Sequence, residues 1–400
     1  MKGMINCHTH LFNEYHVPED LLKLYVKWIP NFVLPSVGRV LDHPIGNGAL
    51  NLFSFLGTDS FKRYINFIKF GYGMTVNQQF DILRSAYPPG TRFIVLMQDF
   101  KFVSDAKARV SYDSFVNEII ELKHQFPSEI LPFYFMEPRN YDFSTDPNEI
   151  YQSLQEKFDS GHFLGLKMYP AEGYFPWDFR LRPFYQFAQD NDLPIMTHCS
   201  TGGSRYVKQT TEIDRNPLDL KGQHRKIDLP KLAWLNVRKD YTGRAKYFSD
   251  PDNYKEVLVE FPNLKICLAH SGSNDEINLE IDRRNGKNKG HSNWYQKCLD
   301  LVDKNTNVYV DVSYSLYDTR FIQELIKSDF DTTLQVHRSN RLLFGTDFYM
   351  TYTEVGAGEE DLPKVERSLR EKMSQHLPPN LFDKMAYHNA ETWLKSNIYK

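Results

Sequence analysis

Two histidines, His8 and His10, stand one residue apart at the end of a short apolar run near the start of the chain. On a β-strand, residues i and i+2 point to the same face, so both imidazoles would project side by side, and alternation would turn Cys7 away from them. Imidazole nitrogens are common ligands of divalent transition metals. Because a His-x-His pair also arises by chance, a metal site needs further ligands elsewhere in the chain.

Four more side chains of ligand type each close a separate apolar run. They are Lys167 in HFLGLKMYP, His198 in LPIMTHCS, His270 in NLKICLAHSG and Asp347 in RLLFGTDFY. Any one of them could be an ordinary polar residue, but their shared position at the ends of different runs calls for a common cause. Imidazoles combined with a carboxylate suit Zn²⁺, with Mn²⁺ or Fe²⁺ as alternatives. The sequence thus predicts a site for one or two divalent ions, most readily zinc.

Such a site would carry out hydrolytic chemistry. A divalent cation lowers the pKa of bound water to about 7 and so supplies hydroxide at neutral pH. We expect Asp347 to accept the proton of that water and His270 to orient it or act as acid or base. Lys167 leaves two alternatives open, because a neutral amine could form a carbamate that bridges two metals, whereas an ammonium could hold a substrate oxyanion beside one metal.

Eight apolar runs, alternating with helical patterns, would position these side chains. The runs cover residues 4–10, 92–100, 130–138, 162–170, 193–200, 263–272, 307–315 and 341–349, and the helical patterns cover 111–126, 146–158, 183–192, 250–261 and 293–304. This alternation predicts an α/β fold, the (β/α)8 TIM barrel. The carboxyl ends of barrel strands meet at one face, which holds the active site. Strand eight returns beside strand one, so Asp347 should lie near the histidine pair.

The bulk composition predicts one globular domain over residues 1–400. Long insertions at 11–91, with a helix at 58–70, and at 200–250 would form lid or substrate loops. The net charge of -3 argues against nucleic acid and anionic membrane as partners. Four scattered cysteines, no signal-peptide pattern and no apolar run of about 18 residues predict a cytoplasmic protein in a reducing compartment. A homo-oligomer stays possible.

Several motifs together resemble a known family. HTH at 8–10, GLKMYP, PIMTHCS, FPNLKICLAHSG and LLFGTDF look like the amidohydrolase superfamily of metal-dependent TIM-barrel hydrolases. More narrowly they resemble the amidohydrolase-related (amidohydrolase 2) branch, which also holds aminocarboxymuconate-semialdehyde decarboxylase. The resemblance extends to the connecting pieces, including the strand at 309–313 and the HNA at 388–390.

The resemblance implies roles for individual residues. It implies that His8, His10, His198 and Asp347 bind metal and that Asp347 also acts as base. His270 would be a second-metal ligand or the water-activating histidine. Lys167 matches the bridging lysine of binuclear members, although a single metal is common in this branch.

Substrate contacts are expected from residues near the strand ends. The segment 221–246 carries eight Lys or Arg against two Asp, and 282–291 is also basic, although a solvated surface explains such loops equally well. Arg205 could pair with a carboxylate through two hydrogen bonds. Tyr169, Glu172 and Trp177 follow Lys167 and could line the pocket. We therefore expect a small, carboxylated substrate.

These features predict a hydrolase that cleaves a C–N or C–O bond of an amide, lactone or ester. The alternative is a non-oxidative metal-dependent decarboxylase with the same ligands, which release of CO2 would distinguish. A metal-dependent nuclease is disfavoured because phosphate binding requires a basic footprint. A barrel that retains metal but serves as a non-catalytic binding protein is the remaining alternative, and total inactivity alongside tight ligand binding would identify it.

Overall fold

Eight parallel strands form one sheet in sequential order in the computed structural model of the chain. The structure describes residues 3–18, 70–71, 74–200, 202–204, 206, 208, 211–229, 237–287, 293–354 and 362–398. The strands are β1 (Ile5–Thr9), β2 (Arg92–Leu96), β3 (Ile130–Phe135), β4 (Gly165–Met168), β5 (Pro194–Thr197), β6 (Lys265–Leu268), β7 (Val308–Asp311) and β8 (Leu342–Leu343). All eight lie within the predicted runs.

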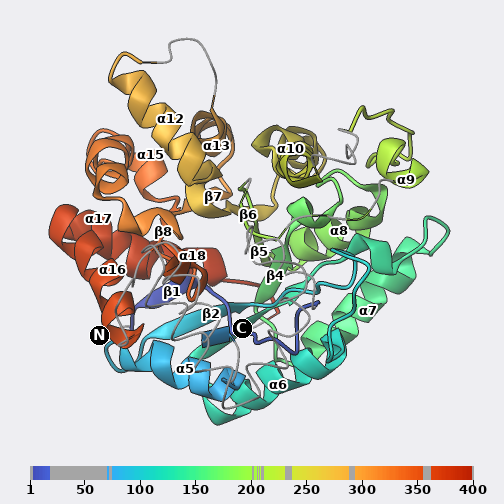
Figure 1. Cartoon of the computed structure of the whole chain (residues 1–400), viewed down its shortest axis with the longest axis horizontal. Helices are drawn as coiled ribbons and strands as arrows, with labels where there is room; N and C mark the ends of the chain where they lie inside the picture. Colours follow the sequence, from blue (N-terminus) through green and yellow to red (C-terminus); the bar gives the residue numbers. More distant parts are fainter. Residues whose placement is uncertain are drawn as a thin grey trace.

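The sheet closes on itself. The backbone N–H of Cys7 donates to the carbonyl of Phe344 over 2.8 Å, and a parallel bridge joins Thr9 to Phe348. These contacts connect β1 to the segment that follows β8. Helices surround the strands (Figure 1). The predicted (β/α)8 barrel is therefore confirmed.

All five predicted helical patterns contain helices. These are α6 (Tyr112–Gln125), α7 (Pro147–Asp159), α8 (Arg182–Asp190), α11 (Tyr254–Glu260) and α13 (Trp294–Lys304). The structure adds α5 (Val76–Ser85), α9 (Glu212–Arg215), α10 (Val237–Ser249), α12 (Asn274–Arg284), α14 (Lys327–Asp329), α15 (Val336–Ser339), α16 (Leu362–His376), α17 (Pro379–Asp383) and α18 (Asn389–Leu394). Among the helices of the described ranges, none combines the length and hydropathy that crossing a bilayer requires.

Both long insertions contain helices within the residues that the structure describes. The insertion at 11–91 contains α5, which links β1 to β2, whereas the helix predicted at 58–70 falls almost wholly outside the described residues. The insertion at 200–250 contains α9 and α10. A lid role for either insertion stays a prediction.

Local signals in the sequence explain where the helices begin. The side chain of Asp146 accepts a hydrogen bond from the backbone N–H of Asn148, and Pro147 occupies the first helical position of α7. The side chain of Ser111 accepts from the backbone N–H of Ser114 at the start of α6. Such caps satisfy backbone donors that have no partner within the helix.

Strand β1 contains one more residue than its partner along the segment that carries the histidine pair. Asn6 pairs with Phe93, but the next pairing joins Thr9 to Val95, so three steps along β1 match two along β2. This is a β-bulge, which redirects the side chains on the longer strand. Phe93 and Val95 belong to the core cluster that includes the outer helices, and their partners on β1 point the same way.

The bulge turns the histidine pair inward. Because Asn6 and Thr9 both face the helices, Cys7 and His8 both face the barrel interior, and His10 follows on the same side. Cys7 accordingly packs in the interior cluster. The expectation that alternation turns Cys7 away from the histidines is therefore wrong, because the extra residue breaks the alternation between positions 7 and 8.

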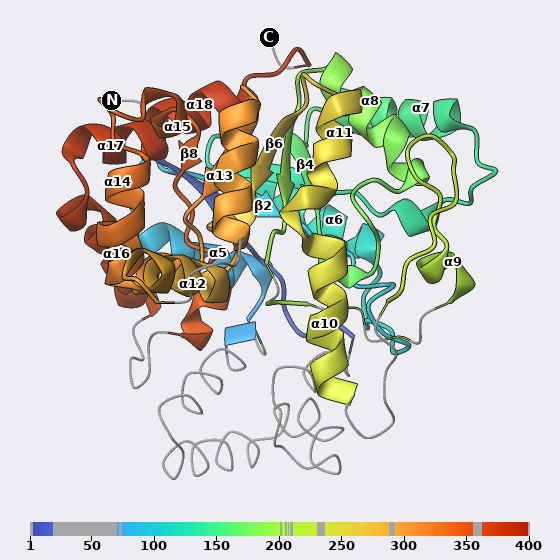
Figure 2. The same ribbon diagram turned by 90° about the horizontal axis from the view of Figure 1, so that it is seen from above.

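Helix α18 covers the amino end of the barrel. Its Trp393 is fully buried in the interior cluster, with ring centroids 5.5 Å from Phe133 and 6.3 Å from Tyr309. Figure 2 shows α18 at the upper end of the strands. The predicted site residues follow the opposite, carboxyl ends, so the core plug and the site lie at opposite ends of the barrel.

Candidate metal centre

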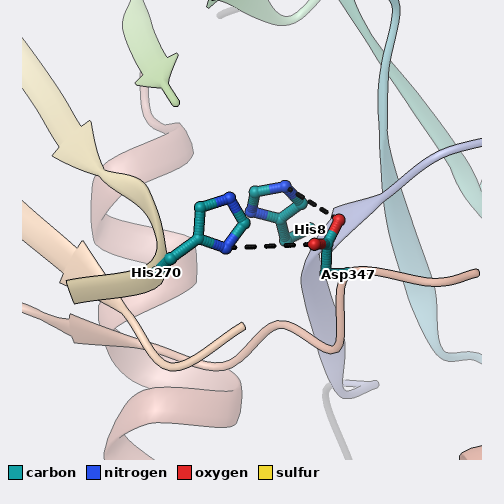
Figure 3. A group of neighbouring side chains, drawn as sticks. All are labelled: His8, His270 and Asp347. Carbon is teal, nitrogen blue, oxygen red and sulfur yellow. Dashed lines mark ion pairs between the residues drawn. The ribbon is translucent and has the colours of Figure 1, made fainter. Parts of the chain in front are cut away.

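Three predicted site residues, all histidines, gather around the carboxylate of a fourth, Asp347. Nε2 of His8 lies 3.4 Å and Nε2 of His10 lies 3.3 Å from Oδ1 of Asp347, and Nδ1 of His270 lies 3.9 Å from Oδ2 of Asp347. One ligand atom each from His8, His270 and Asp347 fits within 4.8 Å of the others (Figure 3). All four residues are buried. Closure of the barrel thus places Asp347 beside the histidine pair, and the turn that follows β6 supplies His270.

Three buried polar atoms at this site have no hydrogen-bond partner among the described residues. They are Nε2 of His8, Oδ1 of Asp347 and Nζ of Lys167. Buried polar atoms without a partner are rare because each one costs free energy. A divalent cation would satisfy the imidazole nitrogen and the carboxylate oxygen together, so the residues present fit a metal ion.

The other nitrogens of the pair fix the tautomers. Nδ1 of His8 lies 2.8 Å from Oδ2 of Asp311, and Nδ1 of His10 lies 3.0 Å from the carbonyl of Leu96. A carboxylate and a carbonyl only accept, so Nδ1 carries the proton in both rings and Nε2 keeps its lone pair. Burial lowers the pKa of both histidines, which keeps them neutral. Both free lone pairs therefore face Asp347.

The side chain of Asn6 ties β1 to the segment after β8. Its Oδ1 accepts from the backbone N–H groups of His8 and Thr346, each over 3.2 Å. Its Nδ2 donates to the hydroxyls of Thr346 and Tyr87, each over 2.9 Å. Asn6 thereby holds the bulge beside His8 and the strand end before Asp347 in one hydrogen-bonded unit.

A buried carboxyl group from α16 completes this unit. Oε1 of Glu366 accepts from Tyr87 over 2.7 Å and from Thr346 over 2.5 Å, whereas its Oε2 has no partner in the described part of the chain. Burial raises the pKa of Glu366 to about 7 from an ordinary value of 4.5. Close to neutral pH this group therefore changes between its neutral and charged forms.

Glu366→Gln should make folding stability less dependent on pH. Between pH 4.5 and 7 the folded chain keeps a proton that the unfolded chain loses, so stability falls as pH rises through this window, and the whole cost is present above it. Glutamine does not titrate. The free energy of unfolding of the variant minus that of wild type, measured by urea unfolding, should be about 2 to 3 kcal/mol larger at pH 8 than at pH 5. Equal differences at both pH values would contradict the buried titration.

Two residues of the site adopt backbone conformations that are unusual for side chains other than glycine. The φ angles are 62° at His270 and 58° at Asp347, in the left-handed region. The backbone N–H of His270 donates to Oδ1 of Asp311 over 2.8 Å, and that of Asp347 donates to the carbonyl of His8 over 2.9 Å. Such conformations cost about 1–3 kcal/mol each and persist where surrounding contacts impose them, often at functional sites.

Asp311 is a functional candidate that the sequence analysis did not assign. It is the last residue of β7, and an apolar run precedes it. The same strand-end rule that selected His198 and Asp347 would therefore have selected it. Although burial raises the pKa of Asp311, His8 and the hydrogen bond from Ser313 lower it to about 2, so it is a carboxylate.

His198 joins the cluster through His270. Its ring stacks on Tyr169 at 3.9 Å, its Nδ1 lies 3.1 Å from Nε2 of His270, and its Nε2 lies 3.1 Å from the carbonyl of Gly202. Both of its nitrogens thus lie beside protein atoms, and neither belongs to the group around Asp347. Its role as a metal ligand stays a prediction.

Lys167 and the predicted substrate residues differ in the contacts that the structure gives them. Nζ of Lys167 lies 5.5 Å from the ring centroid of Tyr169, and burial lowers the pKa of the lysine to about 8. Trp177 stacks on Phe175 at 4.3 Å and donates to Asn253 over 3.1 Å, so its described contacts are structural. Arg205 lies outside the described residues. Substrate contact by Tyr169, Trp177 and Arg205 stays a prediction.

Comparison with known proteins gives a family and a fold. The Amidohydrolase family model (Amidohydro_2) matches residues 140–395. A search of curated protein sequences gave no match. Among solved structures, an uncharacterized TIM-barrel protein from Bordetella bronchiseptica is similar over 98% of both chains, at 13% identity and a TM-score of 0.51.

Two decarboxylases are similar to the same extent. One is 2,6-dihydroxybenzoate decarboxylase from Rhizobium, with 13% identity, coverage of 98% of this chain and 99% of that one, and a TM-score of 0.51. The other is 5-carboxyvanillate decarboxylase from Novosphingobium aromaticivorans, solved with manganese and 4-hydroxy-3-methoxy-5-nitrobenzoic acid. It has 12% identity, coverage of 98% and 96%, and a TM-score of 0.53. At these identities the likeness establishes the barrel fold.

Proposed function

Because this chain belongs to the amidohydrolase family, we propose that it is a metal-dependent enzyme and that its reaction is non-oxidative decarboxylation of a small aromatic carboxylate. The observation that carries the proposal is a set of three buried polar atoms that have no hydrogen-bond partner in the described part of the chain: Nε2 of His8, Oδ1 of Asp347 and Nζ of Lys167. The first two suit a cation, and the third suits an anionic substrate group.

His8, His10 and Asp347 would hold the cation, with His270 beside them. When bound, a divalent cation supplies Lewis acidity that polarises a substrate oxygen. Because both nitrogens of His198 lie beside His270 and Gly202, we propose one ion per chain. Manganese is our first choice, since the solved 5-carboxyvanillate decarboxylase contains it.

The choice of decarboxylation over hydrolysis rests on the similar structures. Two of them are decarboxylases that act on 2,6-dihydroxybenzoate and 5-carboxyvanillate, and they align with nearly the whole chain. This finding favours the alternative of the sequence analysis over its main prediction. An ammonium at Lys167 would attract the carboxylate of such a substrate.

The reaction requires a proton at the carbon that loses CO2. The electron pair of the broken C–C bond stays on the ring carbon, and a proton then forms the new C–H bond. Asp347 and His270 lie in contact and are positioned to hold and deliver that proton. We propose that this pair is the acid and base of the site.

Hydrolysis of a C–N or C–O bond is the second candidate. The family description favours it, and the same residues would then activate water instead of protonating carbon. Both candidates share the metal ligands and differ in the product. The choice can therefore be made by product analysis alone.

The deciding experiment incubates the protein, loaded with Mn²⁺ or Zn²⁺, with two panels. Hydroxybenzoates with an ortho hydroxyl are followed by CO2 release, and lactones, N-acyl amino acids and dipeptides are followed by product formation. CO2 release with inactivity on the second panel supports decarboxylation. Turnover restricted to the second panel would replace it with hydrolysis. Inactivity on both, with tight binding of a carboxylate, would indicate a binding protein.

Lys167→Met should weaken binding of the substrate carboxylate. A hydrogen bond to a charged group contributes about 1.5–3 kcal/mol, so KM should rise about ten- to a hundred-fold while kcat changes less. Methionine keeps an unbranched apolar side chain in the same buried position. Steady-state kinetics measure the effect, and binding of the neutral amide analogue of the substrate is the control. An unchanged KM would exclude Lys167 as the carboxylate partner.

A further inference from the structure

We propose that Asp311, supported by Ser313, is a positioning residue that fixes the proton of His8 on Nδ1 and holds His270 in its left-handed conformation. It thereby sets the affinity of the site for a divalent cation. The inference rests on the proposed function only in requiring that a cation binds.

One oxygen of Asp311 acts on His8. Oδ2 lies 2.8 Å from Nδ1 of His8, and both side chains are buried. A carboxylate oxygen can only accept, so this contact keeps the proton on Nδ1 and leaves Nε2 for the cation. A neutral histidine whose proton sat on Nε2 would have no lone pair to offer there.

The other oxygen of Asp311 acts on His270. Oδ1 accepts from the backbone N–H of His270 over 2.8 Å and from the backbone and hydroxyl of Ser313 over 3.0 and 2.5 Å. The hydroxyl of Ser271 donates to the Asp311 carbonyl over 2.6 Å. These bonds hold residues 270 and 271, whose φ angles are 62° and 48°, in the left-handed region.

Ser313 connects the two histidines directly. Its Oγ lies 3.0 Å from Nδ1 of His8 and 2.9 Å from Nδ1 of His270. Strands β1 and β6 do not pair with each other, so β7 supplies their link through Asp311 and Ser313. Both Asp311 oxygens have hydrogen-bond partners, whereas Oδ1 of Asp347 has no such partner within the described residues. Asp311 therefore positions ligands and is not itself a ligand.

Asp311→Asn tests the inference with almost no change in shape. The remaining oxygen still accepts from His270 and Ser313, but the amide group now points at Nδ1 of His8 as a donor. His8 must then carry its proton on Nε2. We expect the Kd for Mn²⁺, measured by calorimetry on metal-depleted full-length protein, to rise about ten- to a hundred-fold.

A spectroscopic signature separates positioning from simple destabilisation. Nitrogen NMR of the metal-depleted protein should show His8 protonated on Nδ1 in wild type and on Nε2 in Asp311→Asn. The matched control is Asp329→Asn, since Asp329 is a buried aspartate that accepts from Arg284 and Tyr295 in the helical layer. It should lose stability and keep the wild-type Kd.

Three results would overturn the inference. They are a Kd in Asp311→Asn within two-fold of wild type, an unchanged His8 tautomer, or an equal loss of affinity in Asp329→Asn. If Asp311→Asn does not fold, Ser313→Ala decides, because it removes one bond to Asp311 without altering charge. A several-fold rise in its Kd supports the inference, and an unchanged Kd overturns it. Tight Mn²⁺ binding by a wild type that releases no CO2 would refute only the proposed reaction.

Discussion

Asp347→Asn should lower kcat by about a hundred- to ten-thousand-fold, the range expected when a general acid or base is lost. The carboxylate lies within 3.4 Å of the histidine pair and 3.9 Å of His270, so it contacts all three histidines proposed to surround the cation. Asparagine keeps the shape of the side chain but cannot carry a proton and is a weaker ligand. Turnover with saturating Mn²⁺ measures the effect.

The fold should survive this substitution. The backbone N–H of Asp347 bonds to the carbonyl of His8, and that bond does not involve the carboxylate. Unfolding temperature should therefore change little. His10→Ala should abolish turnover, and that protein should also remain folded. Near-normal rates in Asp347→Asn would exclude its role as acid or base.

Trp393→Ala should destabilise the protein by about 3–5 kcal/mol, the usual cost of removing a large buried aromatic side chain. Trp393 closes the amino end of the barrel and contacts the rings of Phe133 and Tyr309. An alanine there would leave a cavity at a point where the rigid strands cannot collapse inward. Unfolding by urea measures the loss, and the rate per folded molecule should stay constant because the site is at the other end.

Trp393→Phe is the matched variant. It keeps an aromatic ring and removes an indole N–H that has no partner within the described residues. We expect Trp393→Phe to lower the free energy of unfolding by well under half as much as Trp393→Ala does. A loss below about 1 kcal/mol in Trp393→Ala would show that α18 does not act as the plug.

The strand pattern and the positions of the candidate ligand residues were predictable from the sequence. Five of the eight predicted runs have an assigned ligand-type residue at the end of the apolar stretch, and barrel closure follows from the eight runs together. This reasoning predicts that Asp347 lies beside His8 and His10, as the structure has it. The same rule applied to the strand that ends at Asp311 would have found the residue that contacts both His8 and His270.

Other features depend on contacts that a linear pattern does not contain. The bulge in β1 exists only relative to the pairing with β2, so alternation within β1 cannot reveal it. The left-handed backbone at His270 and Asp347 is imposed by partners from other strands, and neither residue type favours it. Glu366 lies on a helix about twenty residues after β8, with nothing in its own segment to indicate that it is buried beside the site.

The extra residue of β1 also limits how the His-x-His motif can be transplanted. If β1 were regular and Asn6 still paired with Phe93, His8 and His10 would point at the surrounding helices. Neither ring would then lie beside Asp347. A graft of this segment onto another scaffold that keeps Asn6 two residues before His8 must therefore also keep the irregular pairing with the neighbouring strand.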